Sequence, residues 1–105
     1  MKTLHILNKS PRHPFPALQC ARFYSERDSI LLIEDAVYYT IPSTYQHFLS
    51  TPELKDRQIT ATIYALKEDI DARGIAMQTH SDIKVVTYEG FVELTASDDT
   101  SSSWY

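Results

Sequence analysis

The chain has 105 residues, of which 43% are hydrophobic and 23% are charged, the balance of one soluble globular domain. Its formal net charge of −4 argues against a binder of duplex nucleic acid, which needs a basic surface. No apolar run approaches the roughly 18 residues of a membrane span, and the N-terminal run is too short for a signal peptide. The single cysteine, Cys20, excludes an internal disulfide and a cysteine-rich zinc site. We therefore expect a reduced, cytoplasmic protein that binds neither a metal nor a cofactor.

Four short apolar runs predict the strands of a sheet. They lie at residues 3–7, 29–33, 60–66 and 83–88, each bounded by polar residues and rich in Ile, Leu and Val. The intervals between them are too long for hairpins and carry helical patterns, an alternation typical of parallel sheets with right-handed crossovers. The sequence thus predicts a single α/β domain with a mostly parallel, four- to five-stranded sheet flanked by helices, in the layering of Rossmann and flavodoxin folds.

Helix signals fill each of these intervals. Pro16 suits the first turn of a first helix, and Pro42 suits that of a second. A third helix is predicted over residues 67–74, where Gly74 fits the left-handed position of a Schellman ending. The last helix carries an apolar side formed by Tyr88, Phe91, Val92 and Thr95.

The C-terminal residues differ in composition from the rest of the chain. After Ala96 the sequence reads Ser-Asp-Asp-Thr-Ser-Ser-Ser, which offers nothing to bury, yet it ends in Trp104 and Tyr105. We therefore assign residues 1–97 to the α/β domain and residues 98–105 to a polar tail.

Cys20 is the only thiol and so the only candidate for a catalytic sulfur nucleophile. An equally good interpretation is a small, semi-buried hydrophobic residue at the margin of the apolar side of the first helix. No cation lies one helical turn from it, so its activation would have to come from a tertiary neighbour, with Arg12, His13 and His5 nearest in sequence.

The loop at residues 8–14 follows the first predicted strand, at the sheet edge where open α/β folds place ligands. Lys9, Arg12 and His13 concentrate positive charge there in an otherwise acidic protein. Such a loop would stabilise a thiolate, a persulfide or a bound anion, although a solvated polar loop accounts for the same composition. The two glycines of the chain lie elsewhere and form no phosphate-binding fingerprint.

Two further patterns have simpler explanations than chemistry. Glu34 and Asp35 follow the second strand and suit a helix N-terminus better than a metal or phospho-acceptor site. The four histidines are scattered and lack the spacing of zinc ligands. A receiver-like phospho-acceptor would also need an acidic residue at the end of the third strand, which ends in Leu66 and Lys67.

Aromatic residues exceed what a core of this size needs, with seven tyrosines and four phenylalanines in the chain. Such an excess fits a buried interface, where aromatic side chains anchor binding, and equally fits a tyrosine-rich surface. The candidates for an interface are the aromatic residues that the predicted core stripes least obviously use, namely Phe23, Tyr38, Tyr39, Tyr45 and Trp104.

Four segments, in the same order along the chain, resemble the TusB/DsrH family. They are residues 4–11 (LHILNKSP), 31–38 (LLIEDAVY), 64–74 (YALKEDIDARG) and 86–95 (VTYEGFVELT). Trp104 lies where the family carries a near-terminal tryptophan, whereas the family more usually has glycine at the place of Ala36. The resemblance covers nearly the whole chain.

The resemblance implies a DsrE/F/H-like domain that serves as the third subunit of a sulfur-relay complex. Its implied partners are a TusC/DsrF-like and a TusD/DsrE-like subunit, in a dimer of heterotrimers, and a TusE/DsrC-like protein that accepts persulfide sulfur. The implied process is 2-thiolation of the wobble uridine of certain tRNAs, with sulfur oxidation as the alternative branch. Direct binding of this subunit to a membrane or to nucleic acid is not implied.

Cys20 matches the position at which DsrH-type members carry a cysteine on the first helix. The family's essential sulfur carrier belongs to the TusD/DsrE-like partner, so the resemblance implies a non-catalytic or accessory subunit with Cys20 as an auxiliary persulfide carrier. A different hypothesis is a stand-alone α/β module that binds a small ligand or an anion at the loop of residues 8–14.

Overall fold

The computed structural model describes residues 2–25, 27–54, 61–98 and 100–104, and five strands within these ranges form one all-parallel sheet. The strand order is β4-β3-β2-β1-β5. The strands are β1 (Thr3–Leu7), β2 (Ser29–Leu32), β3 (Thr62–Leu66), β4 (Ile83–Val86) and β5 (Thr100–Trp104). The predicted α/β fold with a parallel sheet is therefore confirmed. Thr60, the first residue of the predicted third strand, lies outside the described residues.

The described part of the chain also forms four α-helices and two 3₁₀ helices. These are α1 (Phe15–Phe23), η1 (Glu34–Thr40), α2 (Pro42–Leu49), α3 (Lys67–Ala72), η2 (Ala76–Gln78) and α4 (Tyr88–Ser97). Pro16 and Pro42 lie in the first turns of α1 and α2, as predicted. Among the helices in these described ranges, not one combines the length and the apolar character that crossing a bilayer requires.

Two local signals set the ends of the later helices. Gly74 adopts φ +66 after α3, and the amides of Gly74 and Ile75 donate to the carbonyls of Asp71 and Ile70, which is the predicted Schellman ending. The fourth strand ends at Val86, two residues earlier than predicted. It ends there because the next residue, a threonine, caps α4 by accepting a hydrogen bond from an amide of its first turn.

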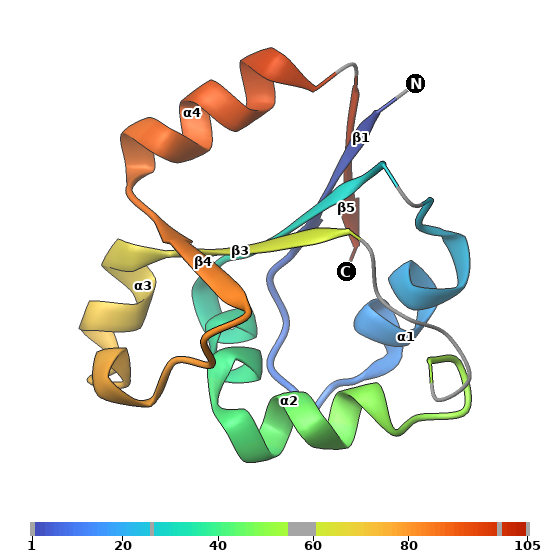
Figure 1. Ribbon diagram of the computed structural model, residues 1–105, viewed down its shortest axis with the longest axis vertical. Coiled ribbons are helices and arrows are strands. Elements are labelled where there is room, and N and C mark those ends of the chain that lie inside the picture. Colours follow the sequence, from blue (N-terminus) through green and yellow to red (C-terminus); the bar gives the residue numbers. More distant parts are fainter. Residues whose placement is uncertain (1, 26, 55–60, 99, 105) are drawn as a thin grey trace.

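The order of the strands divides the helices between the two faces of the sheet. The chain moves in one direction from β1 to β4 and then crosses back to place β5 on the other side of β1. Because crossovers are right-handed, this reversal puts α4 on the face opposite to α1 and α2, as Figure 1 shows. The point of reversal lies between β1 and β5.

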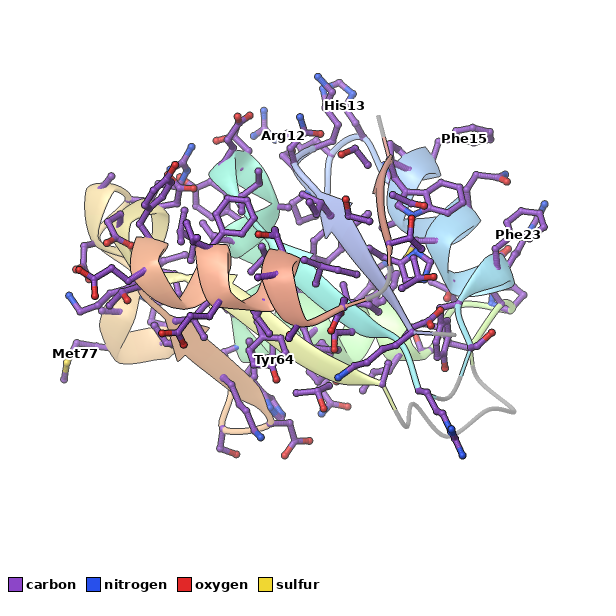
Figure 2. All side chains as sticks on the ribbon, turned by 90° about the horizontal axis from the view of Figure 1, so that it is seen from above. Arg12, His13, Phe15, Phe23, Tyr64 and Met77 are labelled. Carbon is purple, nitrogen blue, oxygen red and sulfur yellow. The ribbon has the colours of Figure 1, made fainter. Side chains whose placement is uncertain are left out.

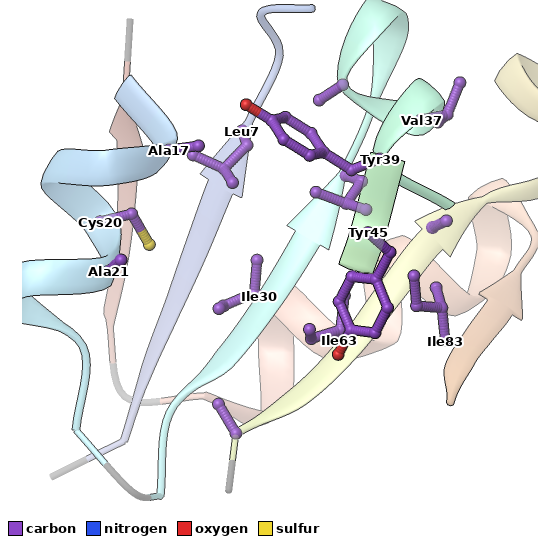
Figure 3. Packing of buried hydrophobic residues seen from close by; sticks show 14 of the residues in the cluster. Leu7, Ala17, Cys20, Ala21, Ile30, Val37, Tyr39, Tyr45, Ile63 and Ile83 are labelled. Atoms are coloured by element: carbon purple, nitrogen blue, oxygen red, sulfur yellow. The ribbon is translucent and has the colours of Figure 1, made fainter. Parts of the chain in front are cut away.

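The two faces of the sheet are buried to different degrees. Under α1 and α2, alternate strand residues pack with the helices into a closed core, shown in Figure 3; they include Leu7, Ile30, Leu32, Ile63, Ala65 and Ile83. On the opposite face Leu4 and Leu31 are fully buried, but Tyr64 is only partly covered. The helix on that side, α4, has no buried residue within its described range. One face is therefore complete and the other is left partly open.

The segment assigned to a polar tail is in fact the edge strand β5, which corrects the predicted domain boundary. Its residues pair in parallel with β1, from Thr3 opposite Thr100 to Leu7 opposite Trp104. Apolar side chains are not needed for this pairing, because backbone hydrogen bonds hold a strand to an open sheet edge. Composition alone therefore could not reveal it, and the domain extends through Trp104.

A chain shortened after Asp98 tests the contribution of β5. Removing the strand uncovers the edge of β1 and the side chains that Trp104 covers, so we expect a loss of at least about 3 kcal/mol, the usual cost of removing a packed tryptophan. Urea unfolding followed by circular dichroism measures it. Ser103→Ala, at an exposed position of the same strand, should change stability by less than about 0.5 kcal/mol. An unchanged urea midpoint in the shortened chain would contradict the assignment of Thr100–Trp104 to the sheet.

Candidate functional site

The carboxyl ends of β1 and β5 meet at the point where the sheet reverses direction, the usual ligand position in open α/β sheets. The loop of residues 8–14 leaves β1 there, and α1 begins at its end. Lys9 and His13 line a surface hollow of about 310 Å³ together with Phe15 and Pro16. Two of the three predicted cations are thus brought together beside an aromatic ring.

Arg12, the third predicted cation, lies in a different hollow of about 510 Å³ that also contains Asp35, Tyr38 and Thr44. The carboxylate of Asp35 accepts hydrogen bonds from the Arg73 guanidinium, at 2.8 and 3.1 Å. An anion would meet a carboxylate in this second hollow, so only the Lys9–His13 hollow suits one. The three loop cations therefore do not form a single site.

Glu34 and Asp35 lie in the first turn of η1, which is the helix N-terminus that their position predicts. The backbone amide of Glu34 donates to the carboxylate of Asp69 at 2.6 Å. Asp69 also pairs with Arg73, one helical turn away, at 3.7 Å. Among the described residues, His, Cys, Asp and Glu side chains form no group of three or more that could hold a metal ion.

Cys20 lies in the closed core and not at the margin of α1. Its side chain is 1% exposed, and Figure 3 shows the sulfur pointing from α1 toward the sheet. Burial, with a further contribution from the negative charge of Asp28, raises the pKa of the thiol to about 12. The charge that acts on the sulfur is thus a carboxylate rather than a cation of the 8–14 loop. In this conformation Cys20 is a protonated thiol without access to another sulfur atom.

Alkylation measures this protection directly. With a pKa of about 12 in the fold against an ordinary 9.0, Cys20 holds about a thousandfold less thiolate at neutral pH than in the unfolded chain. We expect the rate at which iodoacetamide modifies Cys20 to be at least about a thousandfold lower in the native protein than in guanidinium chloride. Mass spectrometry measures both rates. Equal rates would show that the thiol is exposed in solution.

A largely buried hydrogen-bonded chain joins three residues that no pattern in the sequence connects. The Trp104 indole N–H donates to Nδ1 of His5 at 3.0 Å, and Nε2 of His5 lies 2.7 Å from the Asp28 carboxylate. Because an indole nitrogen only donates, Nδ1 must be unprotonated, so the His5 ring is neutral and donates from Nε2 to Asp28. We call these three residues the latch, since they tie β5 to the centre of the sheet.

Asp28 also accepts hydrogen bonds from the backbone amides of Ser25, at 2.8 Å, and Thr3, at 3.0 Å. Burial by itself raises the pKa of this carboxyl, but the hydrogen bonds from Ser25, His5 and Thr3 outweigh it and hold the pKa below 3.8, the ordinary value. The ionised carboxylate is therefore part of the folded structure. The signals available in the sequence were a histidine within an apolar strand and a tryptophan within a polar segment, and neither specifies the other.

The predicted interface aromatics separate into two groups. Tyr39 and Tyr45 belong to the core, which corrects their assignment to an interface. Tyr39 on η1 and Tyr45 on α2 pack into the core under the helices, an orientation that helical spacing alone did not specify. Tyr38 and Trp104 are partly buried against the core, and Phe23 is 65% exposed. The Phe23 ring lies parallel to the Trp104 ring, with centroids 6.1 Å apart.

The latch makes stability depend on pH in a defined direction. Because the pKa of Asp28 in the fold lies below 3.8, its ionised form stabilises the protein above pH 3.8, and this contribution disappears as the pH falls through the folded value. We expect Asp28→Asn to cost about 1–3 kcal/mol at pH 7 and progressively less in acid. Thermal unfolding between pH 3 and pH 7 measures this, with Glu93→Gln on α4 as the control. A cost independent of pH would contradict the ionised latch.

Comparison with known proteins identifies the family of the chain. Residues 9–101 match the family described as DsrH like protein. The proteins named TusB from Salmonella dublin, Salmonella enteritidis PT4 and Salmonella arizonae are each 41% identical to it over 90 residues, which is 86% of both chains. The chain therefore belongs to the TusB/DsrH family, as the sequence resemblance indicated. Membership of this family supports a role as a sulfur-relay subunit.

Solved structures share the fold at lower sequence identity. The ychN protein from E. coli superposes with a TM-score of 0.76 at 19% identity, over 99% of each chain. Protein Tm0979 from Thermotoga maritima gives a TM-score of 0.62 at 23% identity, over 90% of this chain and 91% of that one. These likenesses show the fold.

Proposed function

We propose that this chain is a docking subunit of a cytoplasmic sulfur-relay complex, which it forms with a TusC/DsrF-like and a TusD/DsrE-like subunit. The burial of Cys20 carries this proposal. Persulfide transfer needs a thiolate that reaches another sulfur atom, and a protonated thiol inside the core meets neither condition. A family member of this kind contributes by holding its partners in position, while a partner supplies the reactive cysteine.

The surface of α4 supports a docking role. Tyr88 and Val92 are 60% and 51% exposed and lie one turn apart on the same side of the helix. The ring of Phe91 packs edge-on against the ring of Tyr88, with the ring centroids 5.8 Å apart. We call Tyr88, Phe91 and Val92 the α4 patch. Neighbouring exposed apolar side chains over a partly open sheet face are typical of a surface that a partner covers.

The proposed process is 2-thiolation of the wobble uridine of tRNA, with a TusE/DsrC-like protein as the sulfur acceptor. The relatives of known name at 41% identity are called TusB, which favours this branch over sulfur oxidation. In this proposal the chain itself does not contact the tRNA, in keeping with its formal net charge of −4.

A second candidate function is anion binding by the chain alone. The Lys9–His13 hollow favours it, because no carboxylate lines this hollow in the described part of the chain. Thermal-shift measurements with sulfate, phosphate and thiosulfate test this alternative. A shift that Lys9→Gln removes would support it, whereas unchanged midpoints would exclude it.

Co-expression with the two sister subunits tests the proposed complex. We expect the three chains to elute together in size-exclusion chromatography, and we expect Val92→Glu to weaken binding at least about tenfold by placing a charge in the α4 patch. Glu93→Gln, which changes the charge of the same helix by one unit outside the patch, should not. Elution of the wild-type chain alone would contradict the proposal.

The same complex tests the role of Cys20. After incubation with cysteine and a cysteine desulfurase, mass spectrometry should find an added sulfur atom on the TusD/DsrE-like subunit and none on this chain. Added sulfur on Cys20 would establish it as the auxiliary carrier that the resemblance implies, and would overturn a purely docking role.

A further inference from the structure

The outer edge of β5 is an open strand edge at the side of the sheet away from β4. Natural proteins usually protect such edges with charged residues, proline or a bulge. Thr100–Trp104 contains neither a charge nor a proline, and its five residues pair with β1 in uninterrupted register, so it has no bulge. The edge is therefore built in a way that permits another strand to pair with it.

The backbone groups that would pair can be assigned. The amide of Thr100 donates to the carbonyl of Lys2 at 3.3 Å, so Thr100 faces β1. Because backbone groups alternate along a strand, Ser102 and Trp104 also face β1, while Ser101 and Ser103 direct their N–H and C=O groups to the open side. These two residues would form the first hydrogen bonds with an added strand.

Two exposed aromatic rings lie beside this edge. Phe15 and Phe23, at the two ends of α1, are 67% and 65% exposed. Figure 2 shows both projecting at the side of the molecule beyond β5, opposite Met77. Through its parallel contact with Trp104, Phe23 connects this apolar surface to the end of β5. An added strand would therefore find apolar surface for its side chains as well as backbone partners.

Positive charge marks one end of the same surface. Lys9 and His13 line the hollow that contains Phe15, next to the carboxyl end of β5, and no carboxylate among the described residues lines it with them. A segment lying along β5 would bring one of its own residues to this hollow. Charge complementarity therefore favours a segment that carries a carboxylate at that end.

We propose that the outer edge of β5 binds an extended segment of a partner protein by strand addition. Its apolar side chains contact Phe15 and Phe23, and its acidic end meets Lys9 and His13. A second copy of the chain fits less well, because the strand it would add, Thr100–Trp104, has no carboxylate for the cations. This surface is separate from the α4 patch, and the proposal does not depend on a role in sulfur relay.

Fluorescence anisotropy with a synthetic peptide tests the proposal on the full chain. The probe is a short labelled peptide of alternating valine and threonine that ends in aspartates, and the matched probe ends in lysines. We expect the aspartate peptide to bind at least about tenfold more tightly, with the difference shrinking as salt is added. Equal affinities, or no binding of either peptide, would overturn the proposal.

Two variants with matched controls locate the binding. Ser103→Pro removes an outward N–H while leaving the pairing with β1, and should weaken the aspartate peptide about tenfold, whereas Ser103→Ala should not. Phe15→Ser should also weaken it, whereas Met77→Ser, which removes a side chain 98% exposed at the opposite side, should not. Thermal unfolding checks that each variant is folded. If Ser103→Pro does not fold, the comparison of Phe15→Ser with Met77→Ser tests the binding surface instead.

Light scattering identifies the occupant of the edge. We expect the wild-type chain, measured alone, to be a monomer. A dimer that Ser103→Pro dissociates would show that a second copy fills the edge, and would overturn the assignment to a partner segment.

Discussion

The hydrogen bond between Trp104 and His5 connects residues 99 positions apart and holds the open side of the sheet together. The indole can only donate, so it requires a neutral imidazole, which in turn donates to Asp28. Asp28 then fixes the amide of Thr3 at the beginning of β1. A buried polar chain of this kind is stable only when every member is paired, because an unpaired buried group costs more than a hydrogen bond contributes. It adds a side-chain link to the backbone pairing of β5 with β1, and it holds Trp104 where the Phe23 ring lies parallel to it.

The two sheet faces are covered unequally, so the domain has a packed core on one side and exposed apolar side chains on the other. The face under α1 and α2 packs around its apolar residues and buries Cys20, and this burial raises the pKa of the only thiol. The other face keeps Tyr88 and Val92 of α4 in solvent. A domain of this size buries a smaller share of its surface than a larger one does, so a partner that covers the remaining apolar area adds stability. The same arrangement of helices buries the cysteine on one face and leaves apolar surface on the other, where we propose that a partner docks.

Local sequence signals predicted the fold well where the decisive contacts are close in the chain. The Schellman ending at Gly74 and the starts of α1 and α2 at their prolines each involve residues within one or two helical turns. The site was less predictable. Lys9 and His13 do line one hollow, but the separation of Arg12 from them follows from the path of the loop in space, which the spacing of charges does not specify.

The sequence by itself determined the α/β class, the parallel sheet and the family, because hydrophobic period, helix capping and collinear motifs are properties of neighbouring residues. Only the tertiary structure decided that Thr100–Trp104 is a strand, that Cys20 is buried and that Tyr39 and Tyr45 belong to the core. Each of these outcomes depends on partners far away in the chain. A serine-rich segment pairs because the edge of β1 is open beside it, and a cysteine or a tyrosine is buried because another element packs over it. Backbone pairing and burial of this kind leave no local pattern in the residues that undergo them.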